Sequence, residues 1–453
     1  MARAALAAVL LAAALGLYLQ GVERQHARNN DVTGTDQRTY LRYAQRLRES
    51  GYAYTIPRNR MPLYPLVQAL FLPREGDLAA SFEAGKRVNA ALSLAVLAGA
   101  FAVFRLYLTL WEASLAIAVA AYTVLVFKAP WVQAEVLFYG LQLGVFVLLF
   151  ELARRPRWPL ALAAGVLAAL AHLTKASLPP AVLLGLACLG AHLLLDLREA
   201  RCARSAGAWR RPAATLLAGA LFAGAFLGVL SPYLSTSKRM YGRYFYNVNS
   251  TFYMWCESWD DARARVRAAG DRAGWPELAP EEIPGPRKYL REHSWAQIGE
   301  RIAHGWRTHR RNVWTFYPAG PFLDLYAGFL AIVALVQVRA LPARLLARRG
   351  WIATGFVLAY FLGYGLLYVW YVPIGGGARF ILALYLPALF ALAWAASARR
   401  LAAFPWRLRG RDLDPLRSGR ALAAALGLVV AARLAWYLAT RYAGWTAWLY
   451  GGA

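Results

Sequence analysis

Asp36 stands in the polar stretch Asn29–Tyr40, between two strongly apolar parts of the chain. If those parts enter a membrane, its carboxylate lies at a boundary between water and lipid. An enzyme works at such a boundary when one substrate is a lipid and the other carries a polar hydroxyl, and a carboxylate can accept the hydroxyl proton. Asp36 could instead cap the helix that follows, because aspartate is a favoured N-cap. Asp31 is the second choice for a base.

Other charged residues stand where apolar segments begin or end. Glu135 opens one such segment, where a carboxylate is costly unless it is paired or reaches water, and it could also cap that helix. Lys175 ends another segment and could anchor it by extending to the interface. Arg379 follows three glycines, which allow close approach of the backbone, and it could equally be a plain boundary charge.

The composition points to a membrane. Of the 453 residues 59% are hydrophobic and only 17% are charged, whereas a soluble protein carries about a quarter charged residues. Apolar runs near the length that a membrane span needs occur at 4–20, 88–109, 114–128, 137–152, 158–174, 178–195, 213–232, 321–338, 351–371, 379–397 and 420–438. The sequence therefore predicts an all-α integral membrane protein with about eleven transmembrane helices.

The distribution of charge predicts how the chain is oriented. The net charge of +27 could suggest nucleic acid, but arginines concentrate in four short connections near residues 154–157, 198–211, 339–349 and 399–420. The opposite short connections hold only Lys128, Lys175 and Arg379. This positive-inside pattern predicts that the arginine-rich connections and the N-terminus are cytoplasmic, and it excludes a nucleic-acid partner. A cleaved signal peptide is the alternative for 4–20.

Two large segments then lie outside the cytoplasm, within a single polytopic domain over 1–453. They are 21–87 and 233–316. Each contains an expected amphipathic helix: Tyr40, Tyr43, Ala44 and Leu47 recur on one face of the first, and Ile298, Ile302 and Trp306 on one face of the second, opposite Arg301. Such helices suit the membrane surface, with packing on the helix bundle as the alternative.

The first of these segments carries a resemblance to a known family. Asp36-Gln-Arg-Thr-Tyr40, then Ala44, Leu47 and Gly51, then Arg58-Asn-Arg60-Met-Pro62-Leu-Tyr64-Pro65 resembles the first outer loop of polytopic glycosyltransferases of the GT-C superfamily, such as protein O-mannosyltransferases and aminoarabinose transferases. Glu135 and the stretch Arg379–Pro387 match two later positions. Gln37 stands where the O-mannosyltransferase branch has glutamate, which puts that branch and its protein acceptor in doubt.

The resemblance implies a GT-C-like fold and an enzyme that moves a single hexose or pentose from a polyprenyl-phosphate donor to a lipid, glycan or protein acceptor. Asp36 is implied as the base of an inverting reaction, with Glu135 as a second catalytic residue and with Tyr40 and Tyr64 at the substrate. A leaving phosphate needs fixed cations, which Arg58, Arg60, Lys175 and Arg379 would supply. The 233–316 segment is expected on the acceptor side.

The expected location is a bacterial inner membrane, with the active site outside the cytoplasm. The usage of amino acids, rich in Ala, Arg and Gly and poor in Lys, favours a bacterium of high genomic GC content. A Mg²⁺ or Mn²⁺ ion would need several oxygen ligands; Asp36 and Glu135 supply too few, so no metal site is assigned and metal dependence stays open. The alternatives from other classes are a transporter or flippase, which would carry paired charges near mid-membrane, and a non-catalytic assembly protein.

Overall fold

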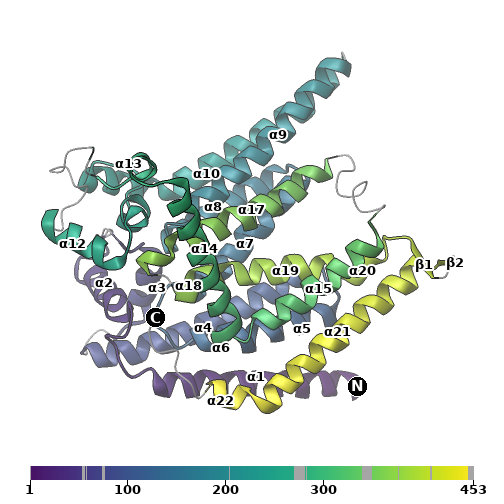
Figure 1. Ribbon diagram of the computed structural model, residues 1–453, viewed down its shortest axis with the longest axis horizontal. Coiled ribbons are helices and arrows are strands. Elements are labelled where there is room, and N and C mark those ends of the chain that lie inside the picture. The colour runs from purple at the N-terminus through teal and green to yellow at the C-terminus, as the bar shows by residue number, and fades with distance from the viewer. Residues whose placement is uncertain are drawn as a thin grey trace.

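The computed structural model describes residues 2–53, 57, 59–73, 77–203, 205–269, 281, 283–338, 349–375, 377–408 and 411–446. Within them the chain is almost entirely helical, with one short hairpin (Figure 1). The α-helices are α1 (Ala2–Arg28), α2 (Gln37–Glu49), α3 (Leu63–Phe71), α4 (Leu78–Arg105), α5 (Leu110–Ala120), α6 (Val126–Lys128), α7 (Glu135–Arg154), α8 (Trp158–Thr174), α9 (Pro179–Ala203), α10 (Arg210–Tyr241), α11 (Val248–Thr251), α12 (Trp259–Ala269), α13 (Pro286–Glu292), α14 (Trp295–Arg311), α15 (Gly320–Val336), α17 (Gly350–Tyr371), α18 (Gly377–Ile381), α19 (Tyr385–Ala395), α20 (Ala398–Leu401), α21 (Pro415–Thr440) and α22 (Tyr442–Thr446).

The remaining elements are short. Two π-helical turns are η1 (Ala121–Leu125) and η4 (Asn312–Phe316), and four 3₁₀ turns are η2 (Ala206–Trp209), η3 (Tyr253–Trp255), η5 (Val372–Ile374) and η6 (Leu382–Leu384). Strands β1 (Trp406–Leu408) and β2 (Arg411–Leu413) pair antiparallel in a hairpin that the sequence pattern does not predict.

All eleven predicted apolar segments lie in helices. In the part of the chain that the structure describes, eight helical stretches are long and apolar enough to cross a membrane, and α8 and α15 are apolar but shorter, at 17 residues each. The expected all-α, multi-pass membrane architecture is confirmed, although the exact number of spans is not.

Helix α7 lies at the centre of the bundle and packs against α4, α8, α9, α17 and α19. The most extensive helix pair is α8 with α10, and most of the buried residues of α8 are small: Ala161, Ala164, Gly165, Ala168, Ala169 and Ala171. A side chain at Gly165 would strike the backbone of Phe222 in α10. Small residues allow the close helix contacts that hold membrane bundles together.

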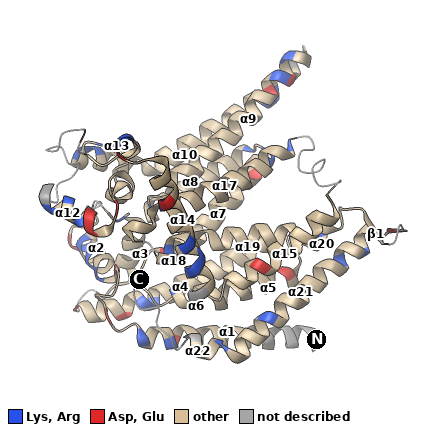
Figure 2. Cartoon of the chain, in the orientation of Figure 1, with Lys and Arg blue, Asp and Glu red and all other residues tan. Residues whose placement is uncertain are grey.

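The connections separate to opposite ends of the bundle. Helices α2, α3, α12, α13, α14 and α18 gather at one end, here called the site end, whereas the far end of α9, α20 and the hairpin lie at the other (Figure 1). Charged residues concentrate near helix ends and in the small helices, and long stretches of α7 and α19 carry none (Figure 2). The described parts of 21–87 and 233–316 supply most of the site end, and the described residues of the arginine-rich connections near 154–157, 198–211 and 399–420 lie opposite (Figure 1).

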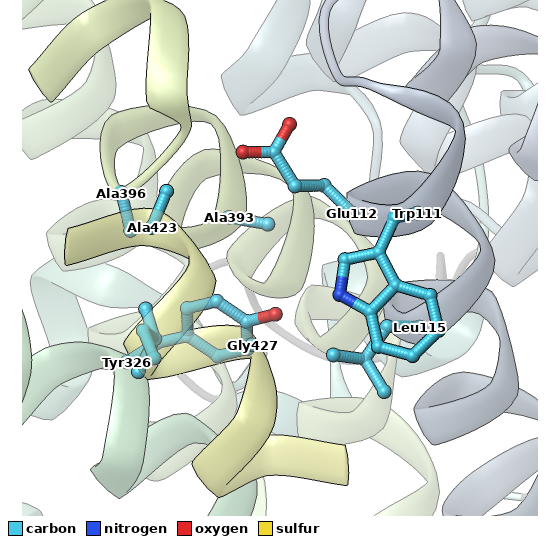
Figure 3. Close-up of a pocket in the computed structure, with 9 residues that line it drawn as sticks. Trp111, Glu112, Leu115, Tyr326, Ala393, Ala396, Ala423 and Gly427 are labelled. Atoms are coloured by element: carbon cyan, nitrogen blue, oxygen red, sulfur yellow. The ribbon is translucent and has the colours of Figure 1, made fainter. Parts of the chain in front are cut away.

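A small pocket at the end opposite the site lies where four helices pack together. The pocket is lined from α5 by Trp111, Glu112 and Leu115 (Figure 3). The facing residues are Tyr326 of α15, Ala393 of α19, Ala396 at the C-cap of α19, and Ala423 and Gly427 of α21. Both oxygens of Glu112 are engaged. One accepts the Ala398 N–H at 2.8 Å, and the other accepts the N–H and hydroxyl of Thr109, each at 2.8 Å. Glu112 therefore joins α5 to the start of α20.

The apolar face of α2 packs on protein. Tyr40, Leu41, Tyr43, Ala44 and Leu47 are buried, mainly against α3 and α4. Of the two alternatives for this amphipathic helix, packing on the bundle therefore holds for its apolar side.

Helix α14 forms where it is expected, but Arg301, expected on its polar face, is buried. The buried residues are Ile298, Arg301, Gly305 and His309, whereas Trp306 is 62% exposed. Gly305 lets α14 approach the backbone of Val369 in α17. The face of α14 that carries Arg301 is buried because this side chain has hydrogen-bond partners there.

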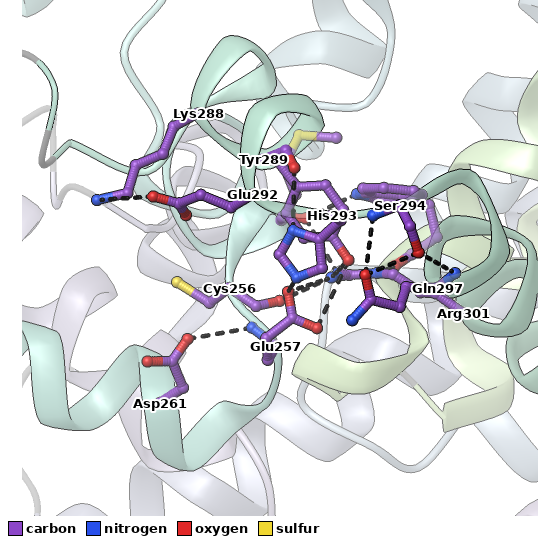
Figure 4. Close-up of polar contacts among 12 residues, drawn as sticks. Cys256, Glu257, Asp261, Lys288, Tyr289, Glu292, His293, Ser294, Gln297 and Arg301 are labelled. Atoms are coloured by element: carbon purple, nitrogen blue, oxygen red, sulfur yellow. Dashed lines mark hydrogen bonds and ion pairs between the residues drawn. The ribbon is translucent and has the colours of Figure 1, made fainter.

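Arg301 donates to the carbonyls of Cys256, Met254 and Trp370 at 3.0–3.2 Å and to the Tyr289 hydroxyl at 3.0 Å. Around it, His293 stacks on Tyr289 and lies 3.1 Å from Glu257 (Figure 4). A buried charge is tolerated when it is fully hydrogen-bonded, and this cluster ties α13 and α14 to the end of α17.

Candidate functional site

Asp36 is held by two arginines that come from distant parts of the chain. One carboxylate oxygen accepts from Arg60, and the other accepts from Nη1 of Arg379 at 2.6 Å. Arg379 lies 343 positions away from Asp36 in the sequence. The three side chains are 15–29% exposed. The site end thus contains a partly buried anion between two guanidinium groups, which can bind an anion in a fixed orientation.

The helix-cap alternative for Asp36 does not hold. Asp36 occupies the N-cap position of α2, but its side chain makes no capping hydrogen bond. Asp77 at the start of α4, by contrast, accepts the Ala80 N–H at 2.8 Å. The two arginines draw the Asp36 carboxylate away from the helix end, so its position serves the charge cluster.

The environment sets the protonation state of Asp36. Burial acts to raise the pKa of its carboxyl group, but the charges of Arg60, Arg379 and Lys175 outweigh burial, and the pKa lies below its ordinary value. The stability that a depressed pKa contributes is present at neutral pH and is lost as the pH falls through the lowered pKa. Asp36 is therefore ionised at neutral pH, and it is a weak base while both arginines hold it.

Glu135 and Lys175 form a second ion pair beside the first. Lys175 Nζ donates to Glu135 Oε1 at 2.7 Å, and the two side chains are only 11% and 3% exposed. The second oxygen of Glu135, Oε2, is buried without a hydrogen-bond partner in the described part of the chain. The Phe380 ring lies under Lys175 at 4.5 Å and under Arg379 at 5.3 Å. Glu135 is thus available to accept a hydrogen bond from a polar ligand.

Helix α7 connects the two ion pairs. Glu135 begins this helix, and Tyr139 one turn later donates from its hydroxyl to the Arg379 carbonyl at 2.7 Å. The structure therefore brings together Asp36, Glu135, Arg60, Lys175 and Arg379, all of which were predicted as site residues. Arg58, the remaining predicted cation, lies outside the described residues.

The loop before Asp36 is fixed to the short segment before α7. Gln37 accepts from the Val132 N–H at 3.0 Å and exchanges two hydrogen bonds with Asn29, while Asn29 donates to the Pro130 carbonyl at 2.9 Å. Gln133 donates to Thr35 at 2.5 Å. Thr35 has a φ of 60°, which is unfavourable for a β-branched residue. Strained residues of this kind often lie at functional sites, and here the strain precedes Asp36.

Arg60 is positioned by the 233–316 segment and by an aromatic ring. Asn249 donates to the Asn59 carbonyl at 3.2 Å, and the Tyr233 hydroxyl contacts the Met61 sulfur at 3.5 Å. The Tyr40 ring lies 5.4 Å from the Arg60 guanidinium. Tyr64 packs edge-on against Tyr40 and is fully buried. Tyr40 thus packs against the Arg60 guanidinium and Tyr64 packs against Tyr40, and the contact of both tyrosines with substrate stays a prediction.

Several residues that shape the site are not found by sequence reasoning. Gln133 and Tyr139 carry no signal in the sequence, whereas Gln37 lies next to Asp36 and Phe380 belongs to the Arg379–Pro387 stretch that matches the family pattern. Among the described residues, no three His, Cys, Asp or Glu side chains are grouped as metal ligands.

An apolar groove of about 360 Å³ lies between α9 and α17. Pro180, Leu183, Leu184 and Ala187 line it from α9, and Ala359, Tyr360, Gly363 and Tyr364 from α17. The Tyr364 hydroxyl donates to the Ser177 carbonyl at 3.0 Å, two residues after Lys175. One end of this groove therefore lies near the loop that carries Lys175.

The fold and the site define an integral membrane protein with a paired cluster of charges at one end of its helix bundle. No family model matches the sequence, and no curated protein matches it. Among solved structures, the chain is similar to ArnT from Cupriavidus metallidurans in the apo state, at 14% sequence identity, over 92% of this chain and 85% of that chain, with a TM-score of 0.33. A likeness this distant carries no functional argument, so the conclusions below rest on the contacts within this chain.

Proposed function

We propose that this protein transfers a single sugar from a polyprenyl-phosphate donor to a hydroxyl group of a lipid, glycan or protein acceptor. The observation that carries the proposal is the placement of the Asp36 carboxylate between Arg60 and Arg379 at the end of a membrane bundle. Such a site holds both groups that the reaction needs, a carboxylate to take a proton and cations to receive a phosphate.

The reaction follows from these groups. The acceptor oxygen bonds to the anomeric carbon while the bond from that carbon to the phosphate oxygen breaks, and the phosphate leaves on the prenyl chain with the bonding electrons. Arg60, Arg379 and Lys175 stabilise the charge that develops on the phosphate. Asp36 takes the proton of the acceptor hydroxyl from the face opposite the leaving group, which inverts the anomeric centre. A weak base suffices, because the hydroxyl becomes acidic as it bonds to a carbon of oxocarbenium character.

The groove between α9 and α17 supports a lipid-linked donor. Its lining is apolar apart from tyrosine hydroxyls, and Leu183 on its rim is 66% exposed. A prenyl chain that lies along it would bring its phosphate towards Lys175 and Arg379. Glu135 Oε2, which lacks a partner, would accept a hydrogen bond from a sugar or acceptor hydroxyl.

The transporter alternative receives less support. A transporter is expected to hold its charges near mid-membrane, whereas these ion pairs lie at helix ends and in loops at the site end. With the arginine-rich connections in the cytoplasm, the site end faces the periplasm of a bacterial inner membrane. The 233–316 segment then presents α12 to α14 to the acceptor.

A donor panel tests the proposed function. Purified protein in detergent is incubated with several prenyl-phosphate-linked hexoses and pentoses and with total membrane lipid as acceptor, and release of free prenyl phosphate is followed by mass spectrometry. We expect one donor to be consumed with a matching mass increase in an acceptor. If no donor is consumed while the same protein moves lipid or solute across reconstituted vesicles, the transporter reading replaces this one.

A further inference from the structure

The donor phosphate of the proposed function and the Asp36 carboxylate would bind the same two guanidinium groups, those of Arg60 and Arg379. Both carboxylate oxygens of Asp36 are engaged by Arg60 and Arg379, and the proposed function requires these two arginines to hold the phosphate. Glu135, the other carboxylate of the cluster, forms its ion pair with Lys175. In the ligand-free protein, Asp36 therefore occupies the place of the substrate anion.

The Asp36 carboxylate does not fill every hydrogen-bond donor of Arg60. Arg60 Nε is buried and has no hydrogen-bond partner in the described part of the chain. A guanidinium group offers five N–H donors in a planar fork, and a phosphate group has more oxygens than a carboxylate to fill them. The vacant donor on Arg60 fits a ligand richer in acceptors than Asp36.

The charges of the cluster also fit an incoming anion. Arg60, Lys175 and Arg379 supply three positive charges, and Asp36 and Glu135 supply two negative charges. One positive charge is left over, and a prenyl-phosphate sugar is a phosphodiester with a single negative charge. Donor binding would balance the excess charge of these five residues, provided that Asp36 yields its arginine contacts, and Lys128, whose charge also acts on Glu135, adds to the attraction for an anion.

We propose that Asp36 is the resident counter-ion of the donor-phosphate site, and that the phosphate displaces it from Arg60 and Arg379 so that the carboxylate turns to the acceptor hydroxyl. This inference rests on the proposed function, because that function places the phosphate at these arginines. It couples the two substrates: the base is held by the arginines until the donor arrives, so water is not activated in the empty site.

The exchange has a consequence for affinity. Wild-type protein must break the contacts of Asp36 with two arginines before phosphate can use them, and this cost lowers the apparent affinity. Removing the carboxylate charge removes the competitor. Asp36→Asn, in which transfer is expected to be strongly slowed, should therefore bind a prenyl phosphate more tightly than the wild-type protein does.

The test measures binding of farnesyl monophosphate at constant pH and ionic strength by titration calorimetry in detergent. We expect Asp36→Asn and Asp36→Ala to lower Kd by roughly 10-fold, or about 1.4 kcal/mol. Glu135→Gln is the comparison within the cluster: it removes an equal charge but frees only Lys175, one of the three cations, so we expect a smaller gain than in the Asp36 variants. Asp31→Asn is the remote control, because the Asp31 side chain accepts hydrogen bonds from Thr33 within its own turn and is not part of the ion-pair cluster.

The outcomes separate the exchange from simple repulsion. A roughly 10-fold gain in the two Asp36 variants supports displacement, with Glu135→Gln lowering Kd by less than roughly 3-fold. An equal gain in Glu135→Gln, or no gain or a loss in folded Asp36 variants, overturns it. If no folded variant binds farnesyl phosphate, both the exchange and the donor class are wrong. If the Asp36 variants gain affinity but the donor panel shows no transfer, the anion site stands and the proposed function fails.

Discussion

Replacing Asp36 with asparagine is expected to reduce the rate of sugar transfer by roughly 10²–10⁴-fold, the range that a positioned general base contributes. Asparagine has the same shape, but its amide cannot take the acceptor proton, and only its carbonyl oxygen can accept a hydrogen bond from an arginine. The measurement is kcat for release of prenyl phosphate, with the donor that the panel identifies. The variant should remain folded, because α2 loses no capping bond at this position.

Asp31→Asn is the control for this experiment. Asp31 lies in the same loop, and its carboxylate accepts from the Thr33 N–H at 2.8 Å and from the Thr33 hydroxyl at 2.6 Å. Its transfer rate should stay within about 2-fold of wild type, in keeping with a surface substitution outside the site. Transfer by Asp36→Asn at the wild-type rate would show that another group is the base, and loss of transfer in Asp31→Asn would move that role to Asp31.

Removing the guanidinium of Arg379 is expected to have the second largest effect. Arg379→Gln should lower kcat by roughly 10²–10³-fold, as loss of one fixed charge or donor at a developing anion commonly does. Arg60 and Lys175 remain, so some transfer should persist. Arg379→Lys keeps the charge but not the planar fork, and we expect it to be intermediate. The measurement is kcat and KM for the donor.

Arg154→Gln provides a matched control. Arg154 pairs with Glu151 at 2.7 Å at the end of α7 that is opposite Glu135. It removes the same charge from an ion pair outside the site, and such exposed pairs contribute at most about 1 kcal/mol. Equal losses of transfer in Arg154→Gln and Arg379→Gln would indicate a general effect of charge or folding, and would contradict a specific role for Arg379.

The membrane helices are predictable from the sequence because their signal is local. Each of the eleven predicted apolar runs lies in a helix, since a continuous run of apolar residues needs no long-range partner to become helical in lipid. The amphipathic helix at 295–311 shows the limit of the same reasoning. Arg301, expected on its polar face, is buried because carbonyls at η3 and in α17 accept its hydrogen bonds, and no periodicity within α14 indicates these partners.

The sequence predicts which charged residues belong to the site, but it does not predict which of them pair with one another. A cation at position 379 and a carboxylate at position 36 could be named from the sequence, whereas their contact depends on how α18 folds back towards α2. Gln37 shows the same limit. In the sequence, Gln37 only puts membership of the O-mannosyltransferase branch in doubt. In the structure it bonds to Asn29 and Val132 and so fixes the loop that presents Asp36.

A structure of the protein with bound prenyl phosphate tests the central claim most directly. The account predicts that the phosphate contacts Arg60 and Arg379 near Lys175, that the prenyl chain runs along the groove between α9 and α17, and that Asp36 has left both arginines. A phosphate bound away from this cluster, with Asp36 still between its two arginines, would contradict the account.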